Sequence, residues 1–302
     1  MTAEKRIIVG LGELVWDLLP AGKQIGGAPA NFAYITTLLG DRGIPASRIG
    51  SDALGEQALQ RLAELDVNAA FVQKDPTNPT GTVKVEVDKE GQPRFDILKP
   101  VAWDFLEWTP KWQQLAKEAD AVCFGSLAQR SPQSRSTILS FLHTTRPATV
   151  RVFDVNLRQN FYSREILAES MKLANIVKLN HDELPQVIRS LELENYCARD
   201  MEQCLLATYD LELVCVTRGS GGSVLISSDE RSEHAGFKVK VRDTVGAGDA
   251  FTAVLVHGYL RRKPLAQINE DANRIGAWVA SESGATPALK ARRLERILAE
   301  MG

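Results

Sequence analysis

Short apolar runs alternate with segments of helical periodicity along most of the 302 residues. The strand-like runs are 6–9, 121–124, 150–153, 176–179 and 213–217. Apolar residues recur at helical spacing in 29–39, 55–65, 132–144, 164–174, 201–209, 247–262, 267–283 and 289–301. Strands that alternate with helices form βαβ units, so this order predicts an α/β fold with a mostly parallel, doubly wound sheet.

Two regions replace this rhythm with strand-like alternation. Residues 82–98 alternate in polarity on both sides of Gly91, which predicts a hairpin at the edge of the main sheet or outside it. Residues 223–240 form a second candidate antiparallel pair. No repeat or linker divides the sequence, so we expect a single domain over 1–302.

Charge and cysteine content narrow the function classes. Lys and Arg number 36 against 38 Asp and Glu, so no basic excess favours nucleic acid as a partner. No apolar run is long enough to span a membrane and the start lacks a signal-peptide core, which predicts a cytoplasmic protein. The four cysteines form no Cys-x-x-Cys pair, and we expect buried free thiols in a reducing compartment.

Polar residues and glycines gather where successive predicted strands end, at 154–158, 180–183 and 217–222. Ligands of open parallel sheets bind beyond the carboxyl ends of the strands. A dinucleotide fingerprint fails near the first strand, because Val15 stands where the third glycine should follow Gly10 and Gly12. No Walker-type phosphate loop occurs either, so the pattern indicates another kind of small-molecule site.

The segment "IGGAPANFA" at 25–33 joins two glycines to a predicted helix start. Gly26 and Gly27 permit close backbone approach, and Pro29 suits the first helical turn. Asn31 lies in that turn, where its amide can face a ligand. The same pattern also fits a plain turn-to-helix junction.

The segment "DTVGAGDAFTA" at 243–253 leads into another helix, which should begin near Ala247 or Gly248. Unpaired N–H groups at a helix start favour an anion, and Gly246 and its small neighbours leave room for a phosphate. Asp249 in the first turn is either a favourable partner of the helix dipole or a base beside the anion. With the strand-end residues, the segment fits phosphoryl transfer, which needs an anion cradle, a divalent metal and a proton acceptor.

The two segments together resemble the signatures of the PfkB, or ribokinase-like, carbohydrate kinases. One signature runs from Gly26-Gly27 through Asn31 and Ala33 to Gly40 and Gly50, and the other is 243–249. The stretches "GELVWD", "GGAPANFA" and "DVNLRQNFY" look most like bacterial fructokinases. The resemblance implies a Rossmann-like α/β/α core with a small β-sheet lid, inserted from roughly 13–25 and 71–100, through which a homodimer could form.

The resemblance also implies roles for individual residues. Asp249 would be the catalytic base, and Gly246, Ala247 and Gly248 would form the anion hole for the transferred phosphate. The sugar site would comprise Asp17, Gly26, Gly27, Asn31 and Arg158. The ATP site would comprise Asn180, Thr217, Gly219, Gly222 and Asn273. Glu183 and Asn180 would organise Mg2+ through water, and K+ would bind near Asp243.

The activity implied is ATP-dependent transfer of a phosphoryl group to a primary hydroxyl of a sugar, with fructose as the leading acceptor. Ribose, a keto-deoxy sugar acid, a nucleoside or a sugar phosphate are the alternatives within this chemistry. A sensor that keeps the fold without catalysis is the alternative from another class. It would have no need of a base beside the phosphate.

Overall fold

The computed structural model describes residues 5–19, 22–87, 93–197, 200–287 and 297. The strands are β1 (Ile7–Leu11), β2 (Val15–Leu19), β3 (Gly22–Gly26), β4 (Arg42–Gly50), β5 (Val72–Asp75), β6 (Gly81–Val87), β7 (Pro93–Ile97), β8 (Ala121–Phe124), β9 (Val150–Asp154), β10 (Ile176–Asn180), β11 (Leu213–Thr217), β12 (Ser223–Ile226) and β13 (Arg231–His234). The helices are α1 (Ala28–Leu38), α2 (Ala53–Glu64), α3 (Pro110–Glu118), α4 (Pro132–Thr144), α5 (Arg164–Leu173), α6 (Glu183–Ser190), α7 (Met201–Tyr209), α8 (Ala247–Leu260) and α9 (Leu265–Ser281). The helix expected at 289–301 lies outside the described residues, apart from position 297.

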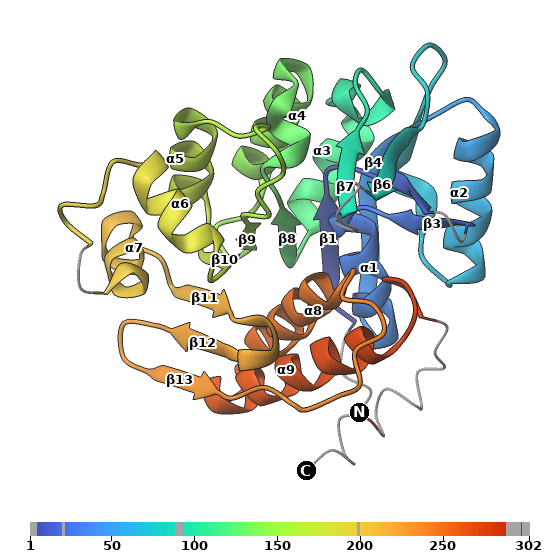
Figure 1. Ribbon diagram of the computed structural model, residues 1–302. Helices are drawn as coiled ribbons and strands as arrows, with labels where there is room; N and C mark the ends of the chain where they lie inside the picture. Colours follow the sequence, from blue (N-terminus) through green and yellow to red (C-terminus); the bar gives the residue numbers. More distant parts are fainter. Residues whose placement is uncertain (1–4, 20–21, 88–92, 198–199, 288–296, 298–302) are drawn as a thin grey trace.

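The main sheet has the strand order β13-β12-β11-β10-β9-β8-β1-β4-β5 (Figure 1). The strands from β11 to β5 in this order run parallel, and β12 and β13 continue the edge in antiparallel pairing. The prediction of a mostly parallel, doubly wound sheet is confirmed. Strand order reverses at β1, which has β4 on one side and β8 on the other, and ligands bind at such a switch point.

Helices cover both faces of this sheet because alternate residues of its strands point to opposite sides. Val9 packs in a core with α3, α4, α5, α6 and α7, whereas Ile8 packs in a second core with α1, α2, α8 and α9. Figure 1 shows α8 and α9 on one side of the sheet and α4, α5 and α6 on the other. Within the described residues, no helix combines the length and apolar character needed to cross a membrane.

A separate four-stranded sheet has the order β3-β2-β6-β7. The hairpin predicted at 82–98 is present as antiparallel β6 and β7, and it lies in this small sheet, outside the main one. Its turn, with Gly91, lies outside the described residues. Strand β2 pairs with β3 and β6, so Asp17 stands in the middle of the small sheet, opposite Gln24 and Val83.

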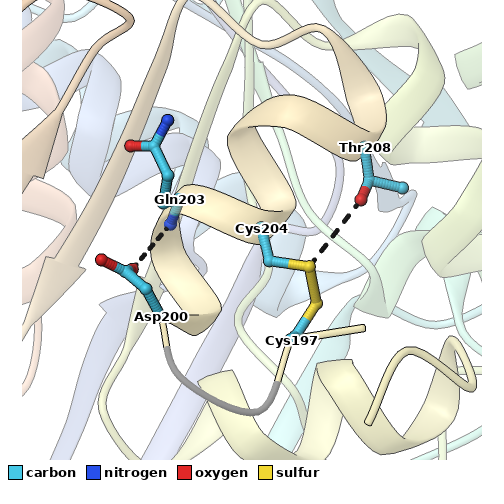
Figure 2. The surroundings of a disulfide bond; sticks show 5 residues. All are labelled: Cys197, Asp200, Gln203, Cys204 and Thr208. Carbon is cyan, nitrogen blue, oxygen red and sulfur yellow. Dashed lines mark hydrogen bonds between the residues drawn. A yellow bond between two sulfur atoms is a disulfide. The ribbon is translucent and has the colours of Figure 1, made fainter. Parts of the chain in front are cut away.

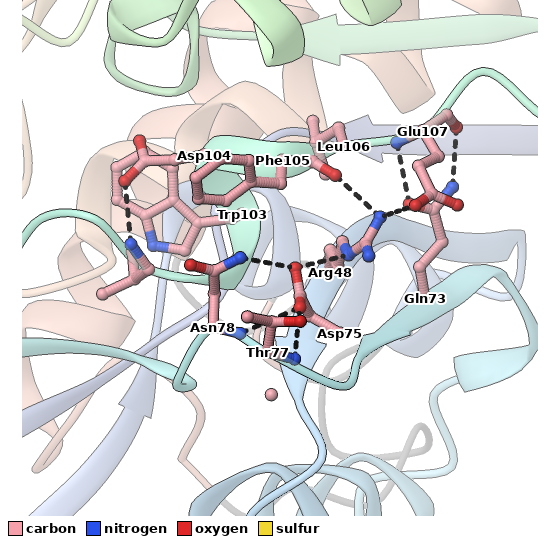
Figure 3. A network of polar contacts seen from close by, with 12 residues as sticks. Arg48, Gln73, Asp75, Thr77, Asn78, Trp103, Asp104, Phe105, Leu106 and Glu107 are labelled. Atoms are coloured by element: carbon pink, nitrogen blue, oxygen red, sulfur yellow. Dashed lines mark hydrogen bonds and ion pairs between the residues drawn. The ribbon is translucent and has the colours of Figure 1, made fainter.

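A buried polar network holds the chain where it leaves the main sheet for the small sheet (Figure 3). Arg48 of β4 forms an ion pair with Asp75 at the end of β5, with 3.1 Å between Nε and Oδ2. Asp75 Oδ1 accepts backbone hydrogen bonds from Thr77 and Asn78, while Arg48 also donates to the Phe105 carbonyl. These contacts fix the base of the small sheet.

The second predicted pair, at 223–240, is present as β12 and β13. It extends the main sheet, because β12 pairs with β11, and its second strand already ends at His234. Residues 235–240 follow as irregular chain that leads toward α8.

The cysteines differ from expectation in one pair (Figure 2). Cys123 and Cys215 are buried free thiols, as expected, but Cys197 and Cys204 form a disulfide, so the expectation of four free thiols is wrong. The reason is local: α7 begins at Met201 and brings Cys204 within 5.3 Å, between Cα atoms, of Cys197.

Candidate active site

The predicted site residues at the strand ends come together because neighbouring parallel strands end side by side. Asp154 is the last residue of β9, Asn180 the last of β10 and Thr217 the last of β11. The register pairs Asn180 with Thr217 and Lys178 with Asp154. These residues therefore lie together at the carboxyl ends of the parallel strands, on the side of the main sheet where the switch point also opens.

The first turn of α8 has the geometry of an anion site. Gly246 precedes the helix with a φ of 77°, and a Cβ there would lie 2.5 Å from the Cβ of Ala285, so only glycine fits. The helix begins at Ala247, and the N–H groups of Gly248 and Asp249 lie in the first turn. An α-helix offers no internal acceptor to N–H groups there, so they can bind an anion.

Asp249 faces the start of α1. Its Oδ2 accepts a hydrogen bond of 2.8 Å from Asn31 Nδ2, which joins the two predicted motifs. Burial, followed by the nearby Asp154 carboxylate, raises the pKa of Asp249, while Asn31, Lys178 and Arg158 oppose that shift. A carboxylate that is reluctant to stay ionised is a stronger proton acceptor than a free one.

Asp17 reaches the same site from the small sheet. A Cβ on Gly26 would lie 2.3 Å from Asp17 Oδ2, so the glycine makes room for this carboxylate. Gly27, with a φ of 99°, immediately precedes α1. Burial raises the pKa of Asp17 to about 6. The charge of Arg158 opposes this rise and that of Asp249 adds to it, so the three groups are close enough to interact. Arg158 itself is exposed on the loop after β9.

Glu13 belongs to this group and was not among the predicted site residues. It is 5% exposed and follows β1, and its Oε2 has no hydrogen-bond partner in the described part of the chain. Burial raises the pKa of Glu13 to about 7, with Asp249 adding to the rise and Arg158 opposing it. The available signal was a charged residue within the apolar stretch 7–16.

Lys178 and Asp154 form a buried ion pair beneath this region. Lys178 Nζ lies 3.0 Å from Asp154 Oδ1, and Thr252 of α8 donates a 2.9 Å hydrogen bond to Asp154 Oδ2. A Cβ built on Gly248 would lie 3.1 Å from Lys178 Nζ. Sequence reasoning treated 176–179 as an apolar strand and passed over this lysine, although a lysine in such a run was the signal.

Asn180 and Glu183 form reciprocal hydrogen bonds just before and at the start of α6. Asn180 Oδ1 accepts from the Glu183 N–H at 2.9 Å, and Glu183 Oε2 accepts from the Asn180 N–H at 2.8 Å. Glu183 Oε1 also accepts from the Leu157 N–H at 2.8 Å, which holds the loop that carries Arg158. Burial raises the pKa of Glu183, and Lys178 opposes the rise.

These contacts bear on metal binding. Among the described residues, no group of three or more His, Cys, Asp or Glu side chains could hold a metal ion. Both oxygens of Glu183 already accept backbone hydrogen bonds. The donor set therefore fits a divalent ion that is carried by phosphate oxygens and water.

The predicted ATP turn follows β11. Gly219 and Gly222 have φ values of 55° and 79°, and a Cβ on Gly222 would lie 1.9 Å from the His234 carbonyl oxygen. Arg218 pairs with acidic side chains at 4.0 Å (Glu202) and 3.7 Å (Glu233). The turn therefore depends on glycines for its backbone conformation, and the ion pairs of Arg218 lie beside it.

Asn273 of α9 lies next to the end of that turn. Its Nδ2 donates to Ser223 Oγ at 2.7 Å and to the Asn269 carbonyl at 2.7 Å. The side-chain amide is therefore committed to a buried network that joins α9 to β12.

Asp243 bridges two loops. Its Oδ1 accepts from the Val245 N–H at 3.0 Å and its Oδ2 from the Gly284 N–H at 3.1 Å. The loop before α8 and the segment 283–285 are thereby held together.

A doubly wound sheet with a half-buried carboxylate in a helix turn that can bind an anion is typical of an α/β phosphotransferase. Comparison with known proteins gives the family: the pfkB family carbohydrate kinase model matches residues 12–292. The chain belongs to the PfkB family of carbohydrate kinases and is a sugar kinase.

Individual relatives agree with this family. A fructokinase of Escherichia coli is 30% identical over 304 residues, which cover 94% of this chain and 96% of the relative. The structure of an uncharacterized sugar kinase from Pyrococcus horikoshii in complex with ATP has 28% identity and a TM-score of 0.81, covering 98% and 100% of the two chains. A double mutant of fructokinase from Vibrio cholerae, bound to fructose, ADP and potassium, has 28% identity and a TM-score of 0.80, covering 97% and 98%.

Proposed function

We propose that this enzyme transfers the γ-phosphoryl group of ATP to a primary hydroxyl of fructose, with Asp249 as the general base. The observation that carries the proposal is the position of Asp249. It lies in the first turn of α8 beside free helix N–H groups, and Asn31 orients its carboxylate. Asp249 Oδ takes the hydroxyl proton, the alkoxide oxygen bonds to the γ-phosphorus, and ADP leaves.

The remaining predicted residues divide between acceptor and nucleotide. Asp17 accepts hydrogen bonds from sugar hydroxyls, and the Asn31 amide also bonds to the sugar. Gly26 and Gly27 allow close approach, and Arg158 lies at the edge of the sugar site. The transferred phosphate lies against the turn of residues 246–248 and accepts hydrogen bonds from the N–H groups at the start of α8. Thr217, Gly219 and Gly222 hold the nucleotide beyond the end of β11, and Asn273 supports that turn from α9 through its hydrogen bond to Ser223. The small sheet closes over the sugar and excludes water, which would otherwise accept the phosphoryl group.

Mg2+ is the divalent ion we propose, bound with ATP and contacted through water by Asn180 and Glu183. When bound, it would neutralise charge on the phosphate oxygens. K+ would bind near Asp243, where the two loops meet. The proposal of a K+ site is supported by the Vibrio cholerae fructokinase, a relative of the same fold whose structure contains a potassium ion.

The charge of the acceptor site favours a neutral sugar over a sugar acid. Glu13 and Asp17 each interact with Asp249 there, and Arg158 is the cation that acts on all three carboxyl groups. An acceptor with its own carboxylate or phosphate would add further negative charge in a poorly solvated site. The fructokinases among the relatives support fructose in particular.

A screen for ADP release tests the proposal. We expect fructose to give the highest kcat/KM among ketoses, aldoses, nucleosides, sugar acids and sugar phosphates, and NMR of the product to show phosphate on a primary hydroxyl. Higher kcat/KM for a sugar acid would overturn the charge argument. A failure of every acceptor to stimulate ADP release, with ATP still binding, would instead favour the non-catalytic sensor.

Two further expectations concern the setting of the enzyme. The small sheet has open edges at β3 and β7, which supports the proposed homodimer through the lid and which sedimentation can test. The proposed location is the cytoplasm, where ATP is available. Disulfides such as Cys197–Cys204 are uncommon in that compartment. Purification in the presence of a thiol-alkylating reagent, followed by mass spectrometry, tests whether these two cysteines are oxidised.

A further inference from the structure

A charged pair lies within the parallel sheet, directly under the proposed chemistry. Lys178 is 7% exposed and Asp154 is 4% exposed, and the lysine Nζ lies 3.0 and 3.2 Å from the two carboxylate oxygens. Replacing a buried ion pair by apolar side chains is often neutral or stabilising. Stability alone therefore does not account for a charged pair at this position.

The pair is connected to the turn at the start of α8 through Thr252, and it lies close to Gly248. Thr252 Oγ1 lies 2.9 Å from both Asp154 Oδ2 and the Gly248 carbonyl oxygen, and these two acceptors share its single hydroxyl proton. The space that a Cβ would occupy on Gly248 lies 3.1 Å from Lys178 Nζ. The absence of a side chain at position 248 thus leaves room for the ammonium group as well as for a phosphate.

Among the groups that the structure describes around Asp249, carboxyl groups outnumber cations, and Lys178 is one of the two cations there. The groups that face Asp249 or its surroundings come from several elements: Asp154 of β9, Lys178 of β10, Cys123 of β8, Asn31 of α1, Arg158 after β9, Glu13 after β1, Asp17 of β2 and Glu183 of α6. Arg158 is exposed, so Lys178 is the buried cation among these groups.

We propose that Lys178 is a positioning residue for phosphoryl transfer, which holds positive charge beside the Gly246–Gly248 turn at the start of α8. Asp154 fixes the ammonium group, and Thr252 ties this pair to α8. The inference rests on the proposed role of Asp249 as base. Lys178 acts through Asp249 and the turn.

The test uses the full-length enzyme with ATP and fructose, and compares Lys178→Met, Asp154→Asn and the double variant. Lys178→Met should lower kcat about 10²-fold, the scale for losing one preorganised electrostatic group. It should also move the acid limb of kcat/KM upward by about one pH unit, because an opposite charge beside Asp249 is lost. Asp154→Asn should move that limb downward, since a like charge is lost. Lys172→Met, at an exposed position of α5, is the control for loss of a lysine and should match the wild type.

The double variant decides between an electrostatic and a structural role. If Lys178 only neutralises Asp154 so that the chain can fold, Lys178→Met with Asp154→Asn should recover wild-type kcat, and the inference is then overturned. Continued slow turnover, with ATP affinity and thermal unfolding close to wild type, supports it. The double variant buries no unpaired charge, so it keeps the test open if Lys178→Met alone fails to fold.

Failure of this inference is distinct from failure of the proposed function. The proposed function is judged by fructose-stimulated ADP release in the wild type. The role of Lys178 is judged by the ratio of each variant to that rate and by the direction in which the acid limb moves.

Discussion

Asn31 Nδ2 donates a 2.8 Å hydrogen bond to Asp249 Oδ2, although the two residues are 218 positions apart in the sequence. Asn31 lies in the first turn of α1 and Asp249 in the first turn of α8, so the contact joins the starts of two helices on the same face of the main sheet. The amide therefore orients the carboxylate that we propose as the base, from the side of the acceptor site.

Asp249→Asn should retain fructose and ATP binding while kcat falls at least about 10²-fold, the usual scale for a general base. The asparagine carbonyl can still accept from Asn31, which keeps the local hydrogen bond. Burial raises the pKa of Asp249, so the wild-type rate should fall with decreasing pH at an acid limb above the ordinary aspartate range. Steady-state kinetics across pH, with binding measured by calorimetry, tests both statements. Near-normal turnover would mean that Asp249 is only a favourable first-turn residue of α8.

Gly26→Ala should weaken fructose binding through Asp17. The new Cβ would lie 2.3 Å from Asp17 Oδ2, so the carboxylate must move. Losing a hydrogen bond to a charged acceptor costs about 1.5–3 kcal/mol, which corresponds to a KM raised about 10- to 100-fold with a smaller change in kcat.

A double-mutant cycle provides the control for Gly26. In an Asp17→Ala background the alanine has no carboxylate to displace, so adding Gly26→Ala should change the KM little further. Additive effects of the two substitutions would show that Gly26 acts independently of Asp17.

Reduction of the Cys197–Cys204 disulfide should lower the thermal midpoint. The bond closes a loop with a sequence separation of 7, and the chain-entropy model assigns such a loop about 2 kcal/mol of stabilisation. Thermal unfolding with and without dithiothreitol measures this effect. The Cys197→Ser/Cys204→Ser variant should unfold at the lower temperature under both conditions, and an unchanged wild-type midpoint in dithiothreitol would contradict the prediction.

The strands of the main sheet can be predicted from the sequence where they are short apolar runs. Strand β4 and helix α6 lack a recognisable local pattern. Strand β4 reads "RGIPASRIG", with glycine, proline and two arginines, yet residues 43–50 are buried, because Arg48 is neutralised by Asp75. Helix α6 contains Pro185, which local rules take as a helix breaker although the first turn tolerates it. Strand β4 therefore depends on a contact that the local pattern does not contain.

The candidate site divides in the same way. Glycines and an acid at a helix start have a local signature, so Gly246 and Asp249 can be recognised from sequence. Glu13 and Lys178 are single charges within apolar runs, and their partners Arg158 and Asp154 are distant in sequence. The disulfide likewise depends on where α7 begins, since cysteine count and spacing do not determine pairing.

Glu13→Gln should stabilise the protein at alkaline pH. Burial raises the pKa of Glu13 from 4.5 to about 7, so the folded state binds a proton more tightly than the unfolded state. Stability from this group is therefore fully present below about pH 4.5 and is lost as pH rises toward 7. Glutamine cannot ionise, so its gain over wild type should be small near pH 5 and reach at most about 3 kcal/mol at pH 8.

Urea unfolding at pH 5 and pH 8 measures this difference in the free energy of unfolding. Glu194→Gln is the matched control, because Glu194 is exposed and its replacement should leave stability nearly unchanged at both pH values. Asp249 adds to the raised pKa of Glu13, so Glu13→Gln combined with Asp249→Asn should gain less than the sum of the two single variants. An equal gain for Glu13→Gln at both pH values would show that packing, rather than ionisation, separates it from the wild type.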